Sequence, residues 1–576
     1  MTVPLAKYIF LRLRSLGVEQ VLGVPGDYSM PMLDYIYEVD GLQYVGTCNE
    51  LNGIYAADGL ARSKRIPAVF SSTYGVGELC AINGLAGANS EDVPIIHLVG
   101  TTSRVYQENH YVCHHAPPQI KGYLPNDHAM YEQSSRPYCV AAEALWDLST
   151  ATKQIDHVIA ESIKWNKPAI LWVPFDMVGL PVDEEDLKRP LNTAIDVSPL
   201  TDEVVDAIYN ALDKAKTVAL LSDMYAERFN LQSYLHKVLD LTKAWGFTTL
   251  LGKSSIDESH PQFVGCYNGH LCLEAVWKNV EGADFVFNVG PNITDSNSGG
   301  YSREIKDEKL IMINKQNAKV FGKLYEDVNF VHVLERLIAK LESGFTPKSA
   351  EKPVAEFSDV ELKGPLHQIM MPKLLSEAVQ EDGFLIAETG TSQFFAMDVK
   401  LKKGAKFFTQ VFYESIGYAL PAAAGVAMGC PGRRVTLLEG DGSAQVTAQE
   451  ISTIVRKKLP VTIFLVNNDG YAIERSIWNE DLDYNDIAHW NWTKVMEAFG
   501  AKEGEVENYQ IRTAEEFLDL VRNPSFQQSK KPQLVELFLE RLDYPDHLYL
   551  QVKLVGERNK INFQKFSEKH DKLPSA

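Results

Sequence analysis

The stretch RRVTLLEGDGSAQVTAQEISTIVRKKLPVTIFLVNNDGY, residues 433–471, decides how the C-terminal third of the chain folds. Two strand-like runs, 433–439 and 461–466, are separated by a segment long enough for one helix. A strand–helix–strand unit of this size predicts two neighbouring parallel strands. The carboxyl ends of both strands then lie at the same edge of the sheet, where open α/β sheets bind their ligands.

Polar residues follow both of these strands. The first strand ends in GDGS (440–443) and the second in NNDGY (467–471). A carboxylate, an amide oxygen and a backbone carbonyl are hard oxygen ligands of the kind that Mg²⁺ prefers. We therefore expect Asp441, Asn468 and the carbonyl of Gly470 to bind a magnesium ion.

The residues after Asp441 suggest a second ligand. Gly442 and Ser443 open the predicted helix, and the free N–H groups of a helix N-terminus can receive a diphosphate. Asp-Gly pairs are also common turn signals, so either motif alone would indicate only a turn. The two motifs at this spacing, together, are far more specific.

The same alternation of strand-like and helical segments runs through the rest of the chain. Strands separated by crossover helices predict mostly parallel sheets. We therefore expect an α/β protein of three domains, each with a mostly parallel sheet flanked by helices. The predicted domains span 1–185, 195–342 and 366–560, and a polar, proline-containing linker joins the last two at 343–365.

The composition limits the possible functions. The chain has 576 residues, of which 45% are hydrophobic and 23% charged, so disordered and fibrous proteins are excluded. A net charge of −20 argues against a nucleic-acid-binding or anionic-membrane surface. The seven cysteines contain no CxxC pair and are too scattered for a disulfide framework. No secretory signal or long apolar span is recognisable, so a cytoplasmic protein is expected.

Two other nucleotide-like motifs are incomplete. The Gly75-Val76-Gly77 segment follows a strand, but Cys80 stands where a Rossmann fingerprint requires its third glycine. Gly252-Lys253-Ser254 resembles the end of a P-loop, yet Phe247 replaces the first glycine. Neither segment is expected to bind a nucleotide.

The GDGS and NNDGY pair resembles the cofactor motif of thiamine-diphosphate enzymes, and further segments narrow the resemblance to eukaryotic-type pyruvate decarboxylases. These segments cover essentially the whole chain. They are PGD (25–27), Glu50 within TCNELNGIYAADGLAR, TYGVGEL (73–79), His114-His115, GKSSIDESHP (252–261), AETGTS (387–392), SIGY (415–418) and FGAKEGEVENYQIRT (499–513).

The resemblance implies a pyrimidine-binding domain, a central domain and a diphosphate- and Mg²⁺-binding domain. It also implies assembly as a homodimer with shared active sites or as a homotetramer, with the cofactor at the subunit interface. The expected reaction is the non-oxidative decarboxylation of a 2-oxo acid to an aldehyde and CO₂ through a thiamine-diphosphate enamine. Pyruvate is the first expected substrate, and neither nucleic acid nor membrane is an expected partner.

The resemblance also assigns roles to residues. Glu50 would hydrogen-bond the aminopyrimidine ring, Ile416 would hold the cofactor bent, and the backbone carbonyl of Glu414 would accept from its amino group. Asp27, His114, His115 and Glu474 would transfer protons on the substrate side, where histidine pKa values near 6.5 suit acid–base work. The remaining predicted cofactor contacts are Thr391, Ser415, Gly442, Ser443, Asn468, Gly470 and Ile473, and the predicted substrate pocket is lined by Ile473, Ile477, Ser296 and Gln393.

The chain departs from this family pattern at several positions. Glu414 stands where the family commonly has glycine, Ser296 where pyruvate-preferring members often have phenylalanine, and Gln393 where a smaller residue is usual. The loop after His115 is proline-rich and about two residues longer than usual. The segment 220–229 lacks the cysteine of some substrate-activated members, so activation by that route is not expected.

These departures leave several activities open. Loss of an aromatic wall enlarges a pocket, which admits branched-chain 2-oxo acids, phenylpyruvate or indolepyruvate. A carboligase that forms acyloins would use the same site. Acetohydroxyacid synthase is disfavoured by His114-His115. A non-catalytic thiamine-diphosphate sensor is the least favoured alternative, because Glu50 and the histidine pair are both present.

Overall fold

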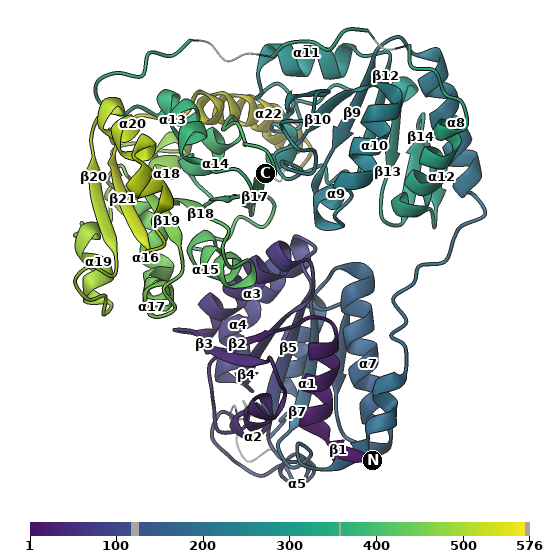
Figure 1. Cartoon of the computed structure of the whole chain (residues 1–576), viewed down its shortest axis with the longest axis vertical. Coiled ribbons are helices and arrows are strands. Elements are labelled where there is room, and N and C mark those ends of the chain that lie inside the picture. Colours follow the sequence, from purple (N-terminus) through teal and green to yellow (C-terminus); the bar gives the residue numbers. More distant parts are fainter. Residues whose placement is uncertain (117–125, 349, 356–358, 571–576) are drawn as a thin grey trace, which may run out of the picture.

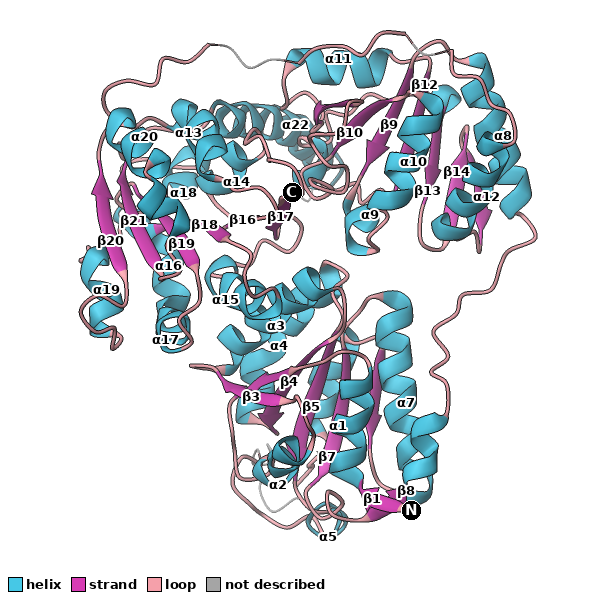
Figure 2. Cartoon of the chain, in the orientation of Figure 1, coloured by secondary structure: helices cyan, strands magenta, loops and turns pink. Residues whose placement is uncertain are grey.

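The computed structural model describes residues 1–116, 126–348, 350–355 and 359–570, which form three α/β domains (Figure 1). Each domain has a sheet of mostly parallel strands with helices packed against it, which confirms the predicted fold class (Figure 2). No helix among the described residues is both long enough and apolar enough to cross a membrane.

The N-terminal domain is built on a six-stranded sheet in which all neighbouring strands are parallel. Its strand order is β3 (Gln43–Gly46), β2 (Gln20–Gly23), β4 (Ala68–Thr73), β5 (Ile95–Thr101), β7 (Ala169–Pro174) and β6 (Ala141–Ala144). Its longer helices are α1 (Leu5–Ser15), α3 (Glu50–Lys64), α4 (Val76–Ser90) and α7 (Leu148–Trp165). Helix α3 begins where the Asn49 side chain caps it by accepting from the Asn52 N–H at 2.8 Å.

The C-terminal domain repeats this topology. Its strand order is β17 (Lys406–Thr409), β16 (Phe384–Ala387), β18 (Val435–Gly440), β19 (Val461–Asn467), β21 (Gln533–Phe538) and β20 (Glu507–Ile511), again all parallel. Helices on this sheet include α13 (Met371–Ala378), α14 (Thr391–Ala396), α15 (Ala419–Gly429), α16 (Asp441–Thr447), α17 (Ile451–Arg456) and α20 (Ala514–Arg522). Counted from the first strand of each sheet, the two strand orders are identical.

The central domain has a different, seven-stranded sheet. Five parallel strands are extended by an antiparallel hairpin, in the order β11 (Phe263–Cys266), β10 (Trp245–Thr248), β9 (Val218–Ser222), β12 (Phe285–Val289), β13 (Leu310–Ile313), β14 (Asn317–Val320) and β15 (Lys323–Glu326). Its main helices are α8 (Thr201–Lys214), α10 (Gln232–Thr242), α11 (Glu274–Gly282) and α12 (Phe330–Glu342). A 25-residue helix, α22 (Asp546–His570), ends the described chain and contacts α14 and α18 (Ala472–Ile477) of the C-terminal domain.

The two six-stranded domains pack through equivalent helices, α3 and α15 (Figure 1). A Cβ atom on Gly59 would lie 2.1 Å from the carbonyl oxygen of Ala422, and one on Gly425 would lie 1.8 Å from that of Ala56. Each helix therefore uses a glycine to let the other backbone approach, which fixes the two domains at close range.

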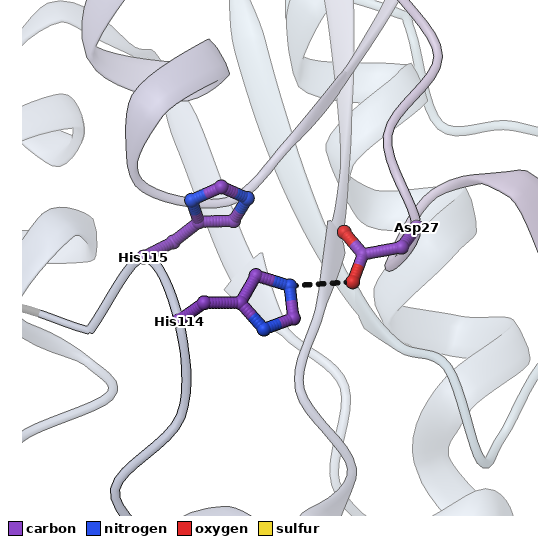
Figure 3. A group of neighbouring side chains, drawn as sticks. All are labelled: Asp27, His114 and His115. Atoms are coloured by element: carbon purple, nitrogen blue, oxygen red, sulfur yellow. Dashed lines mark hydrogen bonds and ion pairs between the residues drawn. The ribbon is translucent and has the colours of Figure 1, made fainter.

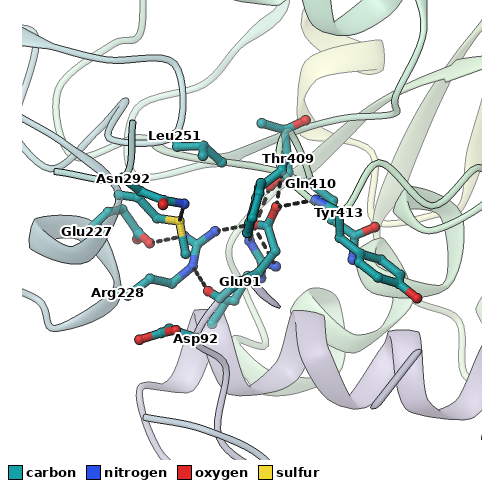
Figure 4. A network of polar contacts seen from close by, with 12 residues as sticks. Glu91, Asp92, Glu227, Arg228, Leu251, Asn292, Thr409, Gln410 and Tyr413 are labelled. Carbon is teal, nitrogen blue, oxygen red and sulfur yellow. Dashed lines mark hydrogen bonds and ion pairs between the residues drawn. The ribbon is translucent and has the colours of Figure 1, made fainter. Parts of the chain in front are cut away.

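All three domains meet at Glu91, just after α4 (Figure 4). Its carboxylate accepts from Arg228 of the central domain at 2.8 Å and from the backbone N–H of Phe412 in the C-terminal domain at 2.9 Å. Arg62 of α3 lies within 3.4 Å of the same carboxylate. The central and C-terminal domains also share a hydrophobic core, whereas Arg228–Glu91 and Lys315–Asp92 are charged contacts between the central and N-terminal domains.

Candidate active site

The first part of the site lies at the carboxyl edge of the C-terminal sheet. Strands β18 and β19 are in register up to Gly440 and Val466, so the residues that follow them are neighbours. Asp441 is buried there, and its two carboxylate oxygens accept from the N–H groups of Gly442 at 2.8 Å and Gly470 at 3.2 Å. Burial raises the pKa of Asp441 to about 6, although these N–H bonds oppose the shift.

Asn468 lies beside Asp441 and is only 4% exposed. Within the described residues, its side-chain amide has no hydrogen-bond partner. Gly470 has a φ of +119°, and a Cβ there would lie 2.4 Å from the carbonyl oxygen of Asn485. A buried carboxylate and an unused amide on a tightly constrained turn are the donor set that a hard cation with a diphosphate requires. These residues fit the predicted metal site.

The helix that follows Asp441 begins as predicted. Gly442 and Ser443 form the first turn of α16, and the Ser443 hydroxyl donates to the carboxylate of Glu439. Glu439 and Glu388 are fully buried acids at the ends of β18 and β16, and burial raises the pKa of Glu388 to about 7. We did not single out these acids from the sequence, although each ends an otherwise apolar strand.

The second part of the site is a histidine–aspartate group in the N-terminal domain (Figure 3). His114 Nε2 lies 2.6 Å from a carboxylate oxygen of Asp27, and the His114 and His115 ring centroids are 4.7 Å apart. Ligand atoms of the three residues all lie within 4.8 Å of one another. Asp27 follows β2, so a strand end of the N-terminal sheet supplies a residue to the predicted proton-transfer set.

Two tyrosines hold the loop that carries the histidines. The Tyr74 hydroxyl donates to the backbone carbonyl of His114 at 2.8 Å, and the Tyr131 hydroxyl donates to that of His115 at 2.6 Å. His115 has a φ of +68°, a conformation that these bonds help to maintain. The predicted alteration of the loop after His115 lies mostly in 117–125, outside the described residues.

Glu50 is the first residue of α3 and faces helix α4. One of its carboxylate oxygens would lie 2.8 Å from a Cβ on Gly77, so the glycine of TYGVGEL leaves room for this side chain. Burial raises the pKa of the Cys80 thiol, and the nearby Glu50 carboxylate adds to the increase. Glu50 is half-buried, at the surface where a ring could approach it.

The segment 413–416 of the C-terminal domain contacts the N-terminal domain. The Ser415 hydroxyl bonds Tyr55 of α3 at 2.5 Å and accepts from the Asn83 side chain of α4 at 3.1 Å. Glu414 has a φ of +53°, the left-handed region where glycine is favoured. Ile416 is 43% exposed, whereas a β-branched residue in a strand–helix turn is usually part of the core. An apolar side chain held at the surface is available to contact a ligand.

The remaining predicted residues lie on two short helices. Ile473, Glu474 and Ile477 are on α18, directly after the NNDGY turn, and the last two are exposed. Thr391 begins α14 and is buried, next to the open space beside Gly390. Both helices therefore start at the same sheet edge as Asp441.

Ser296, Gln393 and Glu414 come from three segments and lie near one another. Burial raises the pKa of the Glu414 carboxyl, and the nearby Ser296 and Gln393 side chains partly offset the increase. The sequence identified each residue as a departure but gave no sign that they are neighbours.

The Asp441 group and the Asp27 group are separate within one chain. The described residues show no hydrogen bond or ion pair between them. Helix α2 (Met30–Leu33), which follows Asp27, lies at the end of the N-terminal domain that is remote from the C-terminal domain (Figure 1). Several large apolar side chains are exposed on this chain, among them Val76, Ile416 and Trp478.

Comparison with protein families gives three matches along the chain. Residues 3–123 match the N-terminal TPP binding domain of thiamine pyrophosphate enzymes, residues 205–341 their central domain and residues 388–537 their C-terminal TPP binding domain. A pyruvate decarboxylase isozyme 3 from Saccharomyces cerevisiae is 35% identical, over 97% of this chain and 99% of the relative. A Candida glabrata pyruvate decarboxylase is 34% identical over the same shares. A transaminated amino acid decarboxylase from Saccharomyces cerevisiae is 32% identical, over 97% of this chain and 96% of the relative.

Proposed function

The chain belongs to the thiamine pyrophosphate enzyme family, and from this premise we propose that it decarboxylates 2-oxo acids without oxidation. The C–C bond to the carboxylate breaks, CO₂ leaves, and a proton takes its place on the carbon that becomes the aldehyde. The observation that carries the proposal is the pairing of a buried Asp441–Asn468 oxygen site with an exposed Asp27–His114–His115 proton-transfer group. The names of the relatives make pyruvate the reference substrate.

The carboxyl edge of the C-terminal sheet would bind the cofactor. Asp441, Asn468 and the Gly470 carbonyl would bind Mg²⁺, and the first turn of α16 would lie against the diphosphate. Ile416 would pack against the bound rings, and Glu50 would hydrogen-bond the aminopyrimidine. When bound, thiamine diphosphate supplies the electron sink for the pair that CO₂ leaves behind.

The Asp27–His114–His115 group of the N-terminal domain would transfer the protons. A proton between His114 Nε2 and Asp27 can be delivered to the product carbon, because a hydrogen bond of 2.6 Å holds the imidazole in place. His115 and Glu474 would complete this set from the adjacent loop and from α18. Water exclusion would depend on apolar residues that are exposed on the single chain.

The separation of the two groups supports a shared site. Because the Asp27 group is remote from Asp441 of the same chain, a second copy would bring its own Asp27 group to this Asp441. We therefore propose a homodimer with shared active sites. We also propose that two such dimers assemble into a homotetramer and that the protein works in the cytoplasm.

The test is CO₂ release and aldehyde formation by the purified chain with Mg²⁺ and thiamine diphosphate. Pyruvate, a branched-chain 2-oxo acid, phenylpyruvate and indolepyruvate form the panel. Turnover of any member supports the proposal. Full cofactor occupancy without turnover of any 2-oxo acid would contradict it and indicate a sensor. An added aldehyde acceptor measures the carboligase share, as acyloin formed relative to free aldehyde.

A further inference from the structure

A second group of metal-ligating side chains lies in the central domain, which supplies neither the Asp441 group nor the Asp27 group. His270 precedes α11, Glu281 is the last residue but one of that helix, and Glu304 precedes β13. One ring nitrogen of His270 and one carboxylate oxygen of each glutamate all lie within 4.8 Å of one another. Three segments of this domain therefore bring an imidazole and two carboxylates to one point.

The Glu281 carboxylate is oriented by its own hydrogen bonds. Its side chain is 9% exposed, and its Oε1 accepts from the Tyr267 hydroxyl at 2.6 Å and from the Glu304 N–H at 3.0 Å. The other oxygen, Oε2, lies 3.3 Å from His270 Nε2. Hydrogen bonds to one oxygen of a carboxylate are the usual way to orient the other oxygen toward a metal. Oε2 is therefore the atom that can bind an ion.

His270 is held at the distance that a metal requires. Its ring packs on Trp277 with the centroids 4.5 Å apart, and its backbone N–H donates to the Ser302 hydroxyl at 2.8 Å. Two metal bonds of about 2.0–2.2 Å that meet at a tetrahedral angle separate their ligand atoms by about 3.3–3.6 Å. The 3.3 Å between Nε2 and the Glu281 Oε2 matches this separation. A metal would take the place of the proton that these two atoms share.

The negative charge of the group is not balanced by a basic side chain. Among the described residues, no lysine or arginine forms an ion pair with the carboxylate of Glu281 or Glu304. Arg303 donates to the Asn288 side chain at 2.9 Å, and Lys309 contacts the backbone carbonyl of Glu281 instead of its carboxylate. Because two carboxylates at this range repel each other, a divalent cation between them is favoured.

We propose that His270, Glu281 and Glu304 bind a divalent transition-metal ion, Zn²⁺ by preference, through one nitrogen and two carboxylate oxygens. An imidazole with two carboxylates suits Zn²⁺ better than Mg²⁺, which is bound by oxygen ligands. Glu304 is exposed, so water can occupy the fourth position. This site is distinct from the Mg²⁺ site proposed at Asp441, and it does not depend on decarboxylase activity.

The ion would fasten a segment that reaches the predicted substrate pocket. Residues 296–304 begin at Ser296, which is predicted to line that pocket, and end at the ligand Glu304. Within the segment, the Gly300 carbonyl accepts from Arg558 of α22 at 2.5 Å. A metal bond from Glu304 to Glu281 of α11 therefore limits the opening of a segment that α22 contacts on its other side.

Zn²⁺ binding to the holoenzyme tests the proposal. The chain is saturated with Mg²⁺ and thiamine diphosphate, and Zn²⁺ is supplied from a nitrilotriacetate buffer and measured by equilibrium dialysis. We expect one Zn²⁺ per chain with a Kd of about 1 μM or below, weaker than at a structural site with four protein ligands. His270→Gln and Glu281→Gln should each weaken binding by about 100-fold, and Glu304→Gln by about tenfold or more, since a lost ligand costs at least as much as a lost outer hydrogen bond.

Matched controls separate this site from other ligands in the chain. Glu308→Gln removes an acid four residues after Glu304, with a side chain that is 77% exposed, and should leave Zn²⁺ binding unchanged. His114→Gln disrupts the other imidazole–carboxylate group and should also retain the bound ion. If the ion survived His270→Gln and were lost in His114→Gln, it would lie at the Asp27 group and the proposal would be overturned. No Zn²⁺ binding by the unmodified chain would overturn it as well.

Hydrogen–deuterium exchange followed by mass spectrometry tests the effect on the segment. Zn²⁺ should slow amide exchange over residues 299–304 in the unmodified chain and in Glu308→Gln. It should have no such effect in Glu304→Gln, a change at an exposed residue that leaves the core intact. Equal exchange with and without bound Zn²⁺ in the unmodified chain would show that the ion does not fasten this segment.

Discussion

The N-terminal and C-terminal domains have the same strand order, but they differ in how deeply they bury the polar groups that follow their strands. In the C-terminal sheet, the third and fourth strands end in Asp441 and Asn468, which are 3% and 4% exposed. In the N-terminal sheet, the first strand leads to Asp27, whose side chain is 48% exposed beside a His114 side chain that is 58% exposed. One edge buries its polar groups and the other presents them.

This difference fits the role proposed for each group. A metal site gains from burial, because water is excluded and the carboxylate interacts strongly with the ion. A proton-transfer group must reach a reacting carbon, so its side chains stay at the surface of the chain that carries them. The shared topology therefore supplies the edges, and the residue types at the strand ends determine the chemistry.

The largest effect is expected on cofactor binding, when the buried Asp441 is replaced. Replacing Asp441 with Ala removes the only predicted charged ligand of the metal. Mg²⁺-dependent binding of thiamine diphosphate, measured by calorimetry, should weaken by about 1000-fold or more, or about 4 kcal/mol. Asp469→Asn is the control in the same turn, because Asp469 is half-exposed and pairs with His489 and Arg541. Equal losses in both variants would contradict the assignment of Asp441.

The contact between the two domains should be the next most sensitive feature. Gly425→Ala places a Cβ 1.8 Å from the carbonyl oxygen of Ala56, and a backbone atom cannot rotate away. We expect the free energy of unfolding to fall by about 3 kcal/mol, measured by denaturant unfolding of the holoenzyme.

A second glycine of the same helix provides the control for this contact. A Cβ on Gly429 would meet the Ser63 hydroxyl at 2.7 Å, and that side chain can move. Gly429→Ala should therefore cost less than about 1 kcal/mol. If the two variants were equally stable, the close crossing of α3 and α15 would not be what joins the domains.

At the exposed edge, Glu50→Gln should change chemistry without changing binding. An amide keeps the size of the side chain but cannot take part in the same proton transfer, so exchange of the C2 proton of bound thiamine diphosphate should slow by about 100-fold. Hydrogen–deuterium exchange followed by NMR measures this rate, and calorimetry verifies that the cofactor still binds. An unchanged exchange rate would remove Glu50 from its proposed role.

The periodicity of the sequence predicted much of the fold, because strands buried on both faces are continuous apolar runs. The segment ELNGIYAADGLARSK matches the bounds of α3, VTIFLV lies in β19, and RRVTLLE enters β18 at Val435. The β14–β15 hairpin was missed because both strands lie at an edge with many exposed polar residues. Helix α22 was missed because it is largely polar and has no clear apolar face.

The candidate site was predictable where its residues belong to short contiguous sequence motifs. Asp441 and Gly470 lie together, as the two motifs imply, and Asp27 meets His114. Contacts between distant segments were not predictable. Neither the Tyr74 bond to the His114 loop nor the nearness of Glu414 to Gln393 has a local pattern, because each depends on how two loops are placed by different strands.

The smallest effect concerns a core position at which the two sheets differ. His97, the third residue of β5, is fully buried and bonds Ser72 at 2.8 Å, while Ile463 is the third residue of the equivalent strand β19. Burial lowers the pKa of His97 to about 3. Between pH 6.5 and 3 the unfolded chain therefore binds a proton that the folded chain does not, so stability falls as the pH falls, by about 1.4 kcal/mol per pH unit from this group.

Thermal unfolding at pH 7 and pH 5 should show a smaller loss of Tm for His97→Gln than for the unmodified chain. The control is His157→Gln, at an exposed site on α7, which should lose as much Tm between pH 7 and pH 5 as the unmodified chain. If His97→Gln also lost as much Tm as the unmodified chain, the buried histidine would not be a source of acid destabilisation in the N-terminal sheet.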